Sequence, residues 1–395
     1  MTSRTPAILG GSAAFPERLH LLRPTLPAVA DLEPDLGELY GSGMLTKGPI
    51  LARYERALAA HLGVHHALAV SSCTAGLMLV FDRFRGAEIV LPSFTFMATA
   101  MAAAWAGLEP IFADIDPDTW CLSPVAAEAA VTPATALVAP VHVFGNPADT
   151  ASFDELGRRR GLAVVYDAAH GFGALRDGAP LGAQGLAQVF STSPTKLLIT
   201  GEGGVVATDD DALAERVRVG REYGNPGDYD AAFVGLNARL PEAGALLGLR
   251  SLELLDREAE RRNTLAAAYR ELLGALPGLA FQAIRPQDRS SYKDFSLRVR
   301  AAEFGLTRDE VAAGLAAEGI DTRAYYVPPV HRLRAFATRG PRFEERLPET
   351  ALLCDEVITL PAYGRLEVEV VERVAACMMA LHERAPDVRR ALGSA

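Results

Sequence analysis

Short, wholly apolar runs alternate with longer helical patterns between residues 49 and 208 of this 395-residue chain. The run Leu162–Tyr166 is apolar throughout, so a strand built from it must be covered on both faces. Strands of this kind separated by helices predict an α/β fold with a mostly parallel central sheet. The expected strands are His66–Ser71, Glu88–Leu91, Pro110–Ala113, Ala136–Val141, Leu162–Tyr166, Gln188–Ser191 and Val205–Thr208, and the expected helices include Pro49–His61 and Thr74–Phe84.

The pattern changes after Pro241. A helical stretch runs from Glu242 to about Leu276, and the residues beyond it predict a smaller α+β unit. We expect an irregular, Pro-rich N-terminal arm (1–40), a large domain (41–241), and a connecting helix with a small C-terminal domain (242–395). The expected elements of the small domain are a strand over Ser291–Arg300, a helix opened by a capping box at Thr307–Glu310, a strand over Val357–Leu360 and a helix over Glu367–Glu383.

Composition excludes several classes of protein. The chain is 49% hydrophobic and 22% charged, its formal net charge is −10, and it has no block of five or six like charges, which argues against binding to nucleic acid. The N-terminal residues make a poor signal peptide, and a cytoplasmic protein is expected. Neither a disulfide framework nor a metal site is indicated, because no CxxC pair occurs among Cys73, Cys121, Cys354 and Cys377.

One uncharged run, Ile89–Leu108, has the 20-residue length of a membrane span. It contains Pro92, a serine, two threonines and many alanines, so it is much less hydrophobic than a leucine-rich span. The run therefore predicts a buried strand, a loop and an Ala-rich helix inside a core, with no membrane.

Two strand ends carry polar residues where ligands bind in open parallel sheets. The segment Ser71–Gly76 passes from strand to helix, and its free N–H groups suit a phosphate, although a simple N-cap by Ser72 or Thr74 explains the same residues. Asp167 follows an apolar strand, where a carboxylate requires hydrogen bonds or a cation such as His170 or a protonated ligand nitrogen. A turn aspartate is the alternative interpretation.

The third strand end leads to Lys196, in a loop flanked by Pro194 and a glycine-rich segment. A lone lysine is usually exposed to solvent, but on a constrained apolar loop its lowered pKa allows Schiff-base formation. A phosphate site, a buried carboxylate and a loop lysine together match the requirements of pyridoxal phosphate (PLP). The sequence therefore indicates a PLP site.

The chain resembles the DegT or StrS family of sugar aminotransferases, which have the aspartate aminotransferase fold (fold type I). The resemblance runs from about Leu19 to about Leu381, and it implies a large domain with a mostly parallel sheet and a smaller α+β domain. The residues that carry it are Thr46–Pro49, Cys73–Ala75, Pro92–Phe96 with Ala98 and Thr99, Asp114–Asp116, Val141 and His142 with Gly145, Asp167–His170, Ser191–Lys196, Gly201–Gly204, Gly235–Arg239 and Pro329–His331.

The resemblance implies three catalytic residues. Lys196 would bind PLP as an imine and move the proton, Asp167 would bind the pyridine nitrogen, and His170 would lie near the ring oxygen. Transamination would then proceed in two half-reactions that use the same lysine.

The resemblance also implies further cofactor contacts. Thr74, Ala75 and Ser191 would hold the phosphate, and Phe96 would stack on the ring, although Phe96 alone also fits a core aromatic. Asn237 would reach the cofactor of the neighbouring subunit, so a homodimer with shared active sites is expected.

Three positions depart from the family pattern. Cys73 replaces the usual glycine before the phosphate threonine, and Thr192–Pro194 replaces a common aromatic-plus-His segment. Lys47 replaces a small polar residue and either binds an anionic substrate or lies on the surface. Arg239 and His331 are further candidates for substrate contacts, with surface or interface positions as the alternative.

The expected activity is transfer of an amino group, with L-glutamate as donor, to a keto group of a nucleotide-activated, dTDP-linked deoxysugar. Alternatives are an inositol-type ketone as acceptor and a non-catalytic regulatory protein on the same fold. A sugar dehydratase on this scaffold would replace the lysine by His, whereas Lys196 is present.

Overall fold

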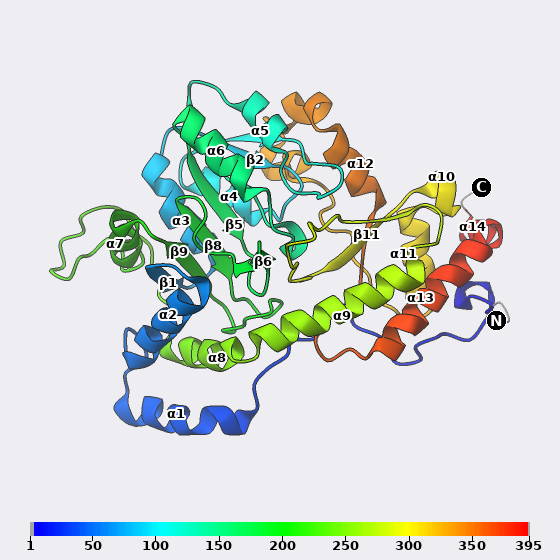
Figure 1. Ribbon diagram of the computed structural model, residues 1–395, viewed down its shortest axis with the longest axis horizontal. Helices are drawn as coiled ribbons and strands as arrows, with labels where there is room; N and C mark the ends of the chain where they lie inside the picture. Colours follow the sequence, from blue (N-terminus) through cyan, green and yellow to red (C-terminus); the bar gives the residue numbers. More distant parts are fainter. Residues whose placement is uncertain (1–3, 394–395) are drawn as a thin grey trace.

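A seven-stranded sheet lies at the centre of the computed structural model, which describes residues 4–393 (Figure 1). The strand order is β1-β9-β8-β5-β4-β2-β3, and β9 alone pairs antiparallel with its neighbours. The predicted mostly parallel sheet is confirmed. Its strands are β1 His66–Val70, β2 Glu88–Pro92, β3 Glu109–Ala113, β4 Thr135–Val138, β5 Ala163–Ala168, β8 Ala187–Ser191 and β9 Gly204–Thr208.

Helices cover both faces of this sheet. Every residue of β8 and β9 is buried, although successive side chains of a strand point to opposite faces. This is the burial expected for apolar strands in a parallel sheet. The surrounding helices are α2 Pro49–Leu62, α3 Cys73–Phe81, α4 Ala98–Trp105, α5 Pro124–Ala130, α6 Thr150–Arg160 and α7 Asp211–Gly220, and a small hairpin is formed by β6 Leu175–Arg176 and β7 Ala179–Pro180.

The uncharged run forms β2, a loop and α4, as predicted. Ile89, Val90 and Leu91 are completely buried, so burial in the protein core accounts for the missing charges of the strand. Within residues 4–393, no helix is long and apolar enough to cross a membrane.

The prediction of a single helix after Pro241 is wrong. The segment forms two helices, α8 Glu242–Leu252 and α9 Leu255–Leu273. Leu246 of α8 and Leu255 and Ala259 at the start of α9 pack with residues of the large sheet, whereas Leu265 further along α9 packs with the C-terminal residues. Helix α9 therefore joins both cores, and Figure 1 shows it extending from the large sheet toward the C-terminal helices.

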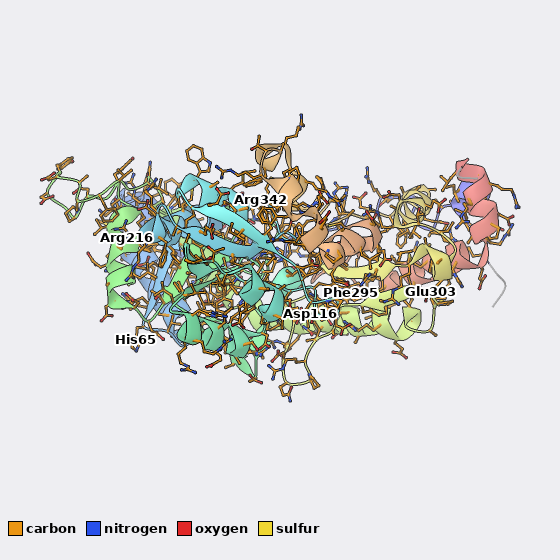
Figure 2. The ribbon with its side chains drawn as sticks, turned by 90° about the horizontal axis from the view of Figure 1, so that it is seen from above. His65, Asp116, Arg216, Phe295, Glu303 and Arg342 are labelled. Carbon is orange, nitrogen blue, oxygen red and sulfur yellow. The ribbon has the colours of Figure 1, made fainter. Side chains whose placement is uncertain are left out.

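The C-terminal unit contains the antiparallel sheet β10 Leu279–Phe281, β11 Phe295–Val299 and β12 Val357–Leu360. The capping box at Thr307 and Glu310 is present, as the sequence predicts. The strand expected from Ser291 begins four residues later, and β10 was not anticipated. Seen from above, Phe295 lies between Asp116 of the large domain and Glu303 of the C-terminal unit (Figure 2). The helices of this unit are α10 Ala301–Phe304, α11 Arg308–Ala317, α12 Pro348–Glu356, α13 Val368–Glu383 and α14 Ala385–Leu392.

The N-terminal segment is only partly irregular. Residues 29–42 form helix α1 (Val29–Ser42), because Leu32, Leu36 and Leu39 recur at helical spacing and pack against the core of the large sheet. The residues before α1 run along the C-terminal unit, as the expected arm would. The boundaries of the three expected parts stay a prediction.

Candidate active site

A cavity of about 360 Å³ opens at the carboxyl ends of β1, β5 and β8. Six of the residues predicted from the sequence line it together: Thr74, Phe96, Asp167, His170, Ser191 and Lys196. The carboxyl ends of parallel strands meet at one edge of a sheet, so the fold itself brings these distant segments into one site. The other lining residues are Ser72, Cys73, Ala98, Ala169, Ser193, Thr195, Glu202, Gly203, Lys293, Asp294, Tyr325 and Tyr326.

The first residues of helix α3 line the cavity. Ser72 is its N-cap, and the Ser72 hydroxyl accepts a hydrogen bond from the Ala75 N–H at 3.0 Å. Ala75 itself does not line the cavity, so the N-cap interpretation holds for this N–H. Cys73 and Thr74 occupy the first helical positions, whose N–H groups have no acceptor within a helix. These two residues therefore supply the free donors that an anion requires.

Asp167 lies at the end of β5 and is 4% exposed. Its Oδ2 accepts a hydrogen bond from Thr99 Oγ1 at 2.7 Å, and its Oδ1 accepts one from the Ala169 N–H at 3.0 Å. Burial raises the pKa of this carboxyl, and the bonds from Thr99 and Ala169 oppose that rise. Among residues 4–393, no cationic side chain forms an ion pair with it. A protonated ring nitrogen of a ligand would supply the missing charge.

The loop that carries Lys196 is fixed at both ends. The Thr192 and Thr200 hydroxyls form a hydrogen bond of 2.6 Å, and the Thr200 N–H donates to the Thr192 carbonyl at 2.9 Å. Leu197 and Leu198, which follow the lysine, are buried in the core. A Cβ on Gly203 would come within 2.3 Å of the Thr200 hydroxyl, so the hydrogen bonds between Thr192 and Thr200 require glycine at position 203. The loop lysine is thus held in place by its neighbours.

The cavity contains two of only three lysines in the chain, Lys196 and Lys293, the third being Lys47. Burial and the charge of Lys293 lower the pKa of Lys196 to about 8. Lys293 Nζ is held by both carboxylate oxygens of Asp294 at 2.9 Å, whereas Lys196 Nζ has no ion pair among the described residues. Lys196 is therefore the amine available for reaction.

His170 and Phe96 both line the cavity. His170 Nδ1 is buried and has no hydrogen-bond partner, and burial keeps the pKa of this imidazole well below its ordinary value. The Phe96 ring is 52% exposed, so its interpretation as a core aromatic is wrong. An unpaired ring nitrogen and an uncovered aromatic face, together with Asp167 and Lys196, fit an aromatic cofactor such as PLP.

Three predicted residues lie away from this cavity. Asn237 is exposed and pairs with Glu222 along the backbone. Lys47 and Arg239 both approach the Glu222 carboxylate, at 3.5 and 2.9 Å. Arg239 also lies over the Tyr223 ring. A substrate that binds Lys47 or Arg239 must therefore compete with an existing carboxylate.

The prediction that His331 contacts substrate is not supported. Its side chain is 1% exposed and does not line the cavity. Its Nδ1 lies 2.6 Å from Ser93 Oγ, and the Ser93 hydroxyl also accepts the His331 N–H at 3.0 Å. His331 fixes the segment after Pro329 against the end of β2 and has no surface left for a ligand.

Sequence reasoning missed Lys293, Asp294, Tyr325 and Tyr326. The adjacent charges of Lys293 and Asp294, just before an apolar strand, were the available signal for a buried pair. The two tyrosines come from a loop of the C-terminal unit, and no local pattern indicates that it closes over the large sheet. Within residues 4–393, no cluster of three or more His, Cys, Asp or Glu side chains is placed to hold a metal ion.

A mostly parallel sheet, an antiparallel C-terminal sheet, and a loop lysine near a strand-end aspartate define the class of fold-type-I aminotransferases. The chain belongs to the DegT/DnrJ/EryC1/StrS aminotransferase family, whose model matches residues 29–379. The resemblance stated from the sequence is confirmed, and so is the prediction of an enzyme. Members of this family are PLP-dependent.

Three similar proteins illustrate the relationship. The dTDP-3-amino-3,4,6-trideoxy-alpha-D-glucose transaminase of Streptomyces venezuelae is 35% identical over 86% of this chain and 88% of its own length. A pleiotropic regulatory protein of Geobacillus stearothermophilus is 34% identical over 91% of this chain and 96% of its own. The crystal structure of DesI in the presence of its TDP-sugar product matches with a TM-score of 0.89 and 36% identity, over 98% of each chain.

Proposed function

We propose that this protein binds PLP and transfers an amino group to a keto group of a nucleotide-activated sugar. The observation that carries the proposal is the convergence of Lys196, Asp167 and the first turn of α3 in one cavity. Lys196 would hold the cofactor covalently, Asp167 would pair with its ring nitrogen, and Thr74 with Ser191 would bind its phosphate. Phe96 and His170 would lie against the ring.

Bound PLP supplies an electron sink for the bonds at the carbon that carries the amine. The residues of the chain do the remaining work. Asp167, supported by Thr99 and Ala169, keeps a proton on the ring nitrogen. Lys196, with its pKa lowered to about 8, takes and returns the proton near neutral pH as general base and acid.

We propose a dTDP-linked keto-deoxysugar as acceptor and L-glutamate as donor. The names of two similar proteins, a dTDP-aminosugar transaminase and DesI with its TDP-sugar product, support the acceptor. An inositol-type ketone is the alternative acceptor. Parallel assays with both classes of ketone, followed by mass detection of the aminated product, separate the two.

We also propose a homodimer in which each subunit completes the other's site. Asn237 follows a segment whose apolar side chains are unusually exposed, with Tyr229 at 98% and Val234 at 88%. Burial of this segment against a second copy would cover both side chains. Sedimentation analysis of the wild type and of Val234→Asp tests this: the substitution is expected to raise the monomer fraction.

Absorbance spectroscopy tests the activity. The PLP-loaded protein should be yellow, bleach with L-glutamate and regain its colour with a keto-sugar nucleotide. The non-catalytic alternative is suggested by the regulatory name of one relative. It predicts that L-glutamate leaves the spectrum unchanged, and that result would exclude transamination with L-glutamate as the donor.

A further inference from the structure

The catalytic cavity contains a buried ion pair that the proposed function does not use. Lys293 Nζ lies 2.9 Å from each carboxylate oxygen of Asp294, and the two side chains are 7% and 6% exposed. The pair precedes β11, so it enters the cavity from the C-terminal unit. In a space of about 360 Å³, a ligand that reacts with Lys196 also comes close to this pair.

The pair is not needed to hold its own loop. The Lys293 N–H donates to the Phe144 carbonyl at 3.0 Å, and the Lys293 carbonyl accepts a hydrogen bond from Arg262 Nη1 at 2.9 Å. These bonds fix the backbone to the large unit and to α9 without the two side chains. Removing two charges from water costs about as much free energy as their attraction gains, so the pair adds little stability. A buried pair of this kind in a cleft indicates a role in binding.

The other charges of the cavity leave Lys293 as the cation for a ligand carboxylate. The proposed function engages Lys196 and Asp167 with the cofactor, and burial keeps the pKa of His170 well below its ordinary value, so this ring is neutral. Lys293 is then the only other cationic side chain that lines the cavity within residues 4–393. An α-amino acid carries its carboxylate one carbon away from its amine, so both groups enter this space together. A carboxylate removed from water requires a cation or hydrogen bonds.

We propose that Lys293 binds the α-carboxylate of the amino donor, and that Asp294 neutralises Lys293 when the acceptor occupies the site. This inference rests on the proposed function, because it assigns one partner of Lys293 to each half-reaction. An ammonium has three N–H donors, so Lys293 keeps one oxygen of Asp294 while it donates to the ligand. The ring of the keto-sugar has no carboxylate, and in its presence Asp294 takes both contacts, as it does in the structure. One cavity thus accepts an anionic donor and an uncharged ring in turn.

Equilibrium binding of 2-methyl-L-glutamate tests the assignment without turnover, because this analogue has no hydrogen on the carbon that carries the amine. Its affinity for the PLP-loaded protein is measured by isothermal titration calorimetry. Lys293→Met should weaken the affinity at least about tenfold, as expected from the loss of a charge-assisted hydrogen bond. Asp294→Asn removes the competing charge and should strengthen the affinity. Arg298→Met is the matched control, because it breaks a buried ion pair with Glu356 outside the cavity and should leave the affinity unchanged.

A second analogue tests whether Lys293 recognises the α-carboxylate. In 4-amino-4-methylpentanoate a methyl group replaces that carboxylate, while the other carboxylate remains. The wild type should prefer 2-methyl-L-glutamate at least about tenfold, and Lys293→Met should lose this preference. Equal affinities in the wild type, or an unchanged preference in Lys293→Met, would overturn the assignment. Lys293→Met combined with Asp294→Asn leaves no unpaired charge, and it replaces the single variant if that variant does not fold.

Bleaching by L-glutamate keeps the two proposals distinguishable. Absence of bleaching in the wild type contradicts the proposed transamination with L-glutamate, whereas normal bleaching with an unchanged preference in Lys293→Met contradicts only the role of Lys293. The role of Asp294 is tested in the second half-reaction. Asp294→Asn should raise the concentration of keto-sugar nucleotide that half-saturates the return of colour, because the charge of Lys293 is then unbalanced. An unchanged concentration would show that Asp294 does not neutralise Lys293 for the acceptor.

Discussion

Lys196 shows how one residue can be destabilising in the free protein and useful in the enzyme. Its amine is buried beside Lys293 and lacks an anionic partner, so its pKa falls to about 8. The unfolded chain holds the same proton up to a pH of about 10.4. The buried amine therefore destabilises the folded protein by its full amount below about pH 8. The stability of the protein rises between pH 8 and pH 10.4, because the unfolded state binds more protons in this range.

Replacing Lys196 by Met should accordingly stabilise the cofactor-free protein by about 3 kcal/mol at pH 7. The difference from the wild type should shrink as the pH rises above 8. Urea unfolding of both proteins at pH 7 and pH 9.5 measures it. Lys47→Met, at a lysine that is 60% exposed, is the control and should change stability little. A stabilisation that is independent of pH would contradict the assigned cause.

Thr99 is expected to act through Asp167. Thr99→Val removes the hydroxyl that donates to Asp167 Oδ2, which should raise the pKa of the carboxyl further. The acid limb of the pH profile for bleaching by L-glutamate should then move up by about one unit. Thr95→Val, which removes a hydroxyl that contacts only Thr99, should shift it less. Equal profiles for Thr99→Val and wild type would show that this bond does not set the ionisation of Asp167.

The residues found from the sequence lie at the carboxyl ends of strands of the large sheet or in the loops that follow them. Asp167 and Ser191 stand at positions where topology alone fixes a common edge. Lys293 and Tyr325 enter the same cavity from the other unit, and their approach depends on how the two cores pack. Local patterns contain no information about that packing.

At the scale of elements, His142 connects β4 to the neighbouring strands. Its Nδ1 accepts the Ala148 N–H at 2.9 Å, its Nε2 lies 3.2 Å from Gln188 Oε1, and its ring stacks on Tyr166. These contacts require Nε2 to carry the proton of a neutral ring. Burial lowers the pKa of His142 to about 4.

The wild type should therefore lose stability as the pH falls from about 6.5 toward 4, because only the unfolded state takes up this proton. Between pH 7 and pH 5 the loss from His142 amounts to about 2 kcal/mol. His142→Asn should be less stable at pH 7 but lack this part of the slope. Urea midpoints at the two pH values measure it, and parallel slopes for both proteins would refute the role of His142.

Prediction of the elements succeeded for the strands of the large sheet and failed for the segment that joins the two cores. The seven strands of the large sheet fall near their expected ranges, because each is apolar on both faces. The stretch 242–276 is helical throughout in pattern, yet it divides between Leu252 and Leu255, and its buried face changes core further on, between Ala259 and Leu265. A helical periodicity of 3.6 residues predicts which face of a helix is buried, but it does not predict against which core that face packs.

For the whole molecule, Glu318 holds the N-terminal segment to the C-terminal unit. Its carboxylate accepts the N–H groups of Ala7 and Ala14, each at 2.8 Å, and pairs with Arg4. The Glu318 side chain is almost completely buried. Ala14 and Phe15 then join the core of the C-terminal unit.

Glu318→Ala should destabilise the protein by about 3 kcal/mol, because three donors lose a buried acceptor. Glu318→Gln, which keeps one acceptor oxygen, should cost less. Limited proteolysis with trypsin should cut Glu318→Ala first at Arg18, before the rest of the molecule is degraded. Simultaneous loss of all peptides would show that the segment unfolds only with the whole protein.

Because lysine occurs at only three positions, two of them in the cavity, occupancy of the site can be recorded as a peptide map. A protease that cuts after lysine should produce four fragments: 1–47, 48–196, 197–293 and 294–395. A carbonyl ligand reduced onto Lys196 removes one cleavage, and the two middle fragments remain joined as 48–293. The ratio of joined to separate fragments then counts loaded molecules directly, with no assay of turnover.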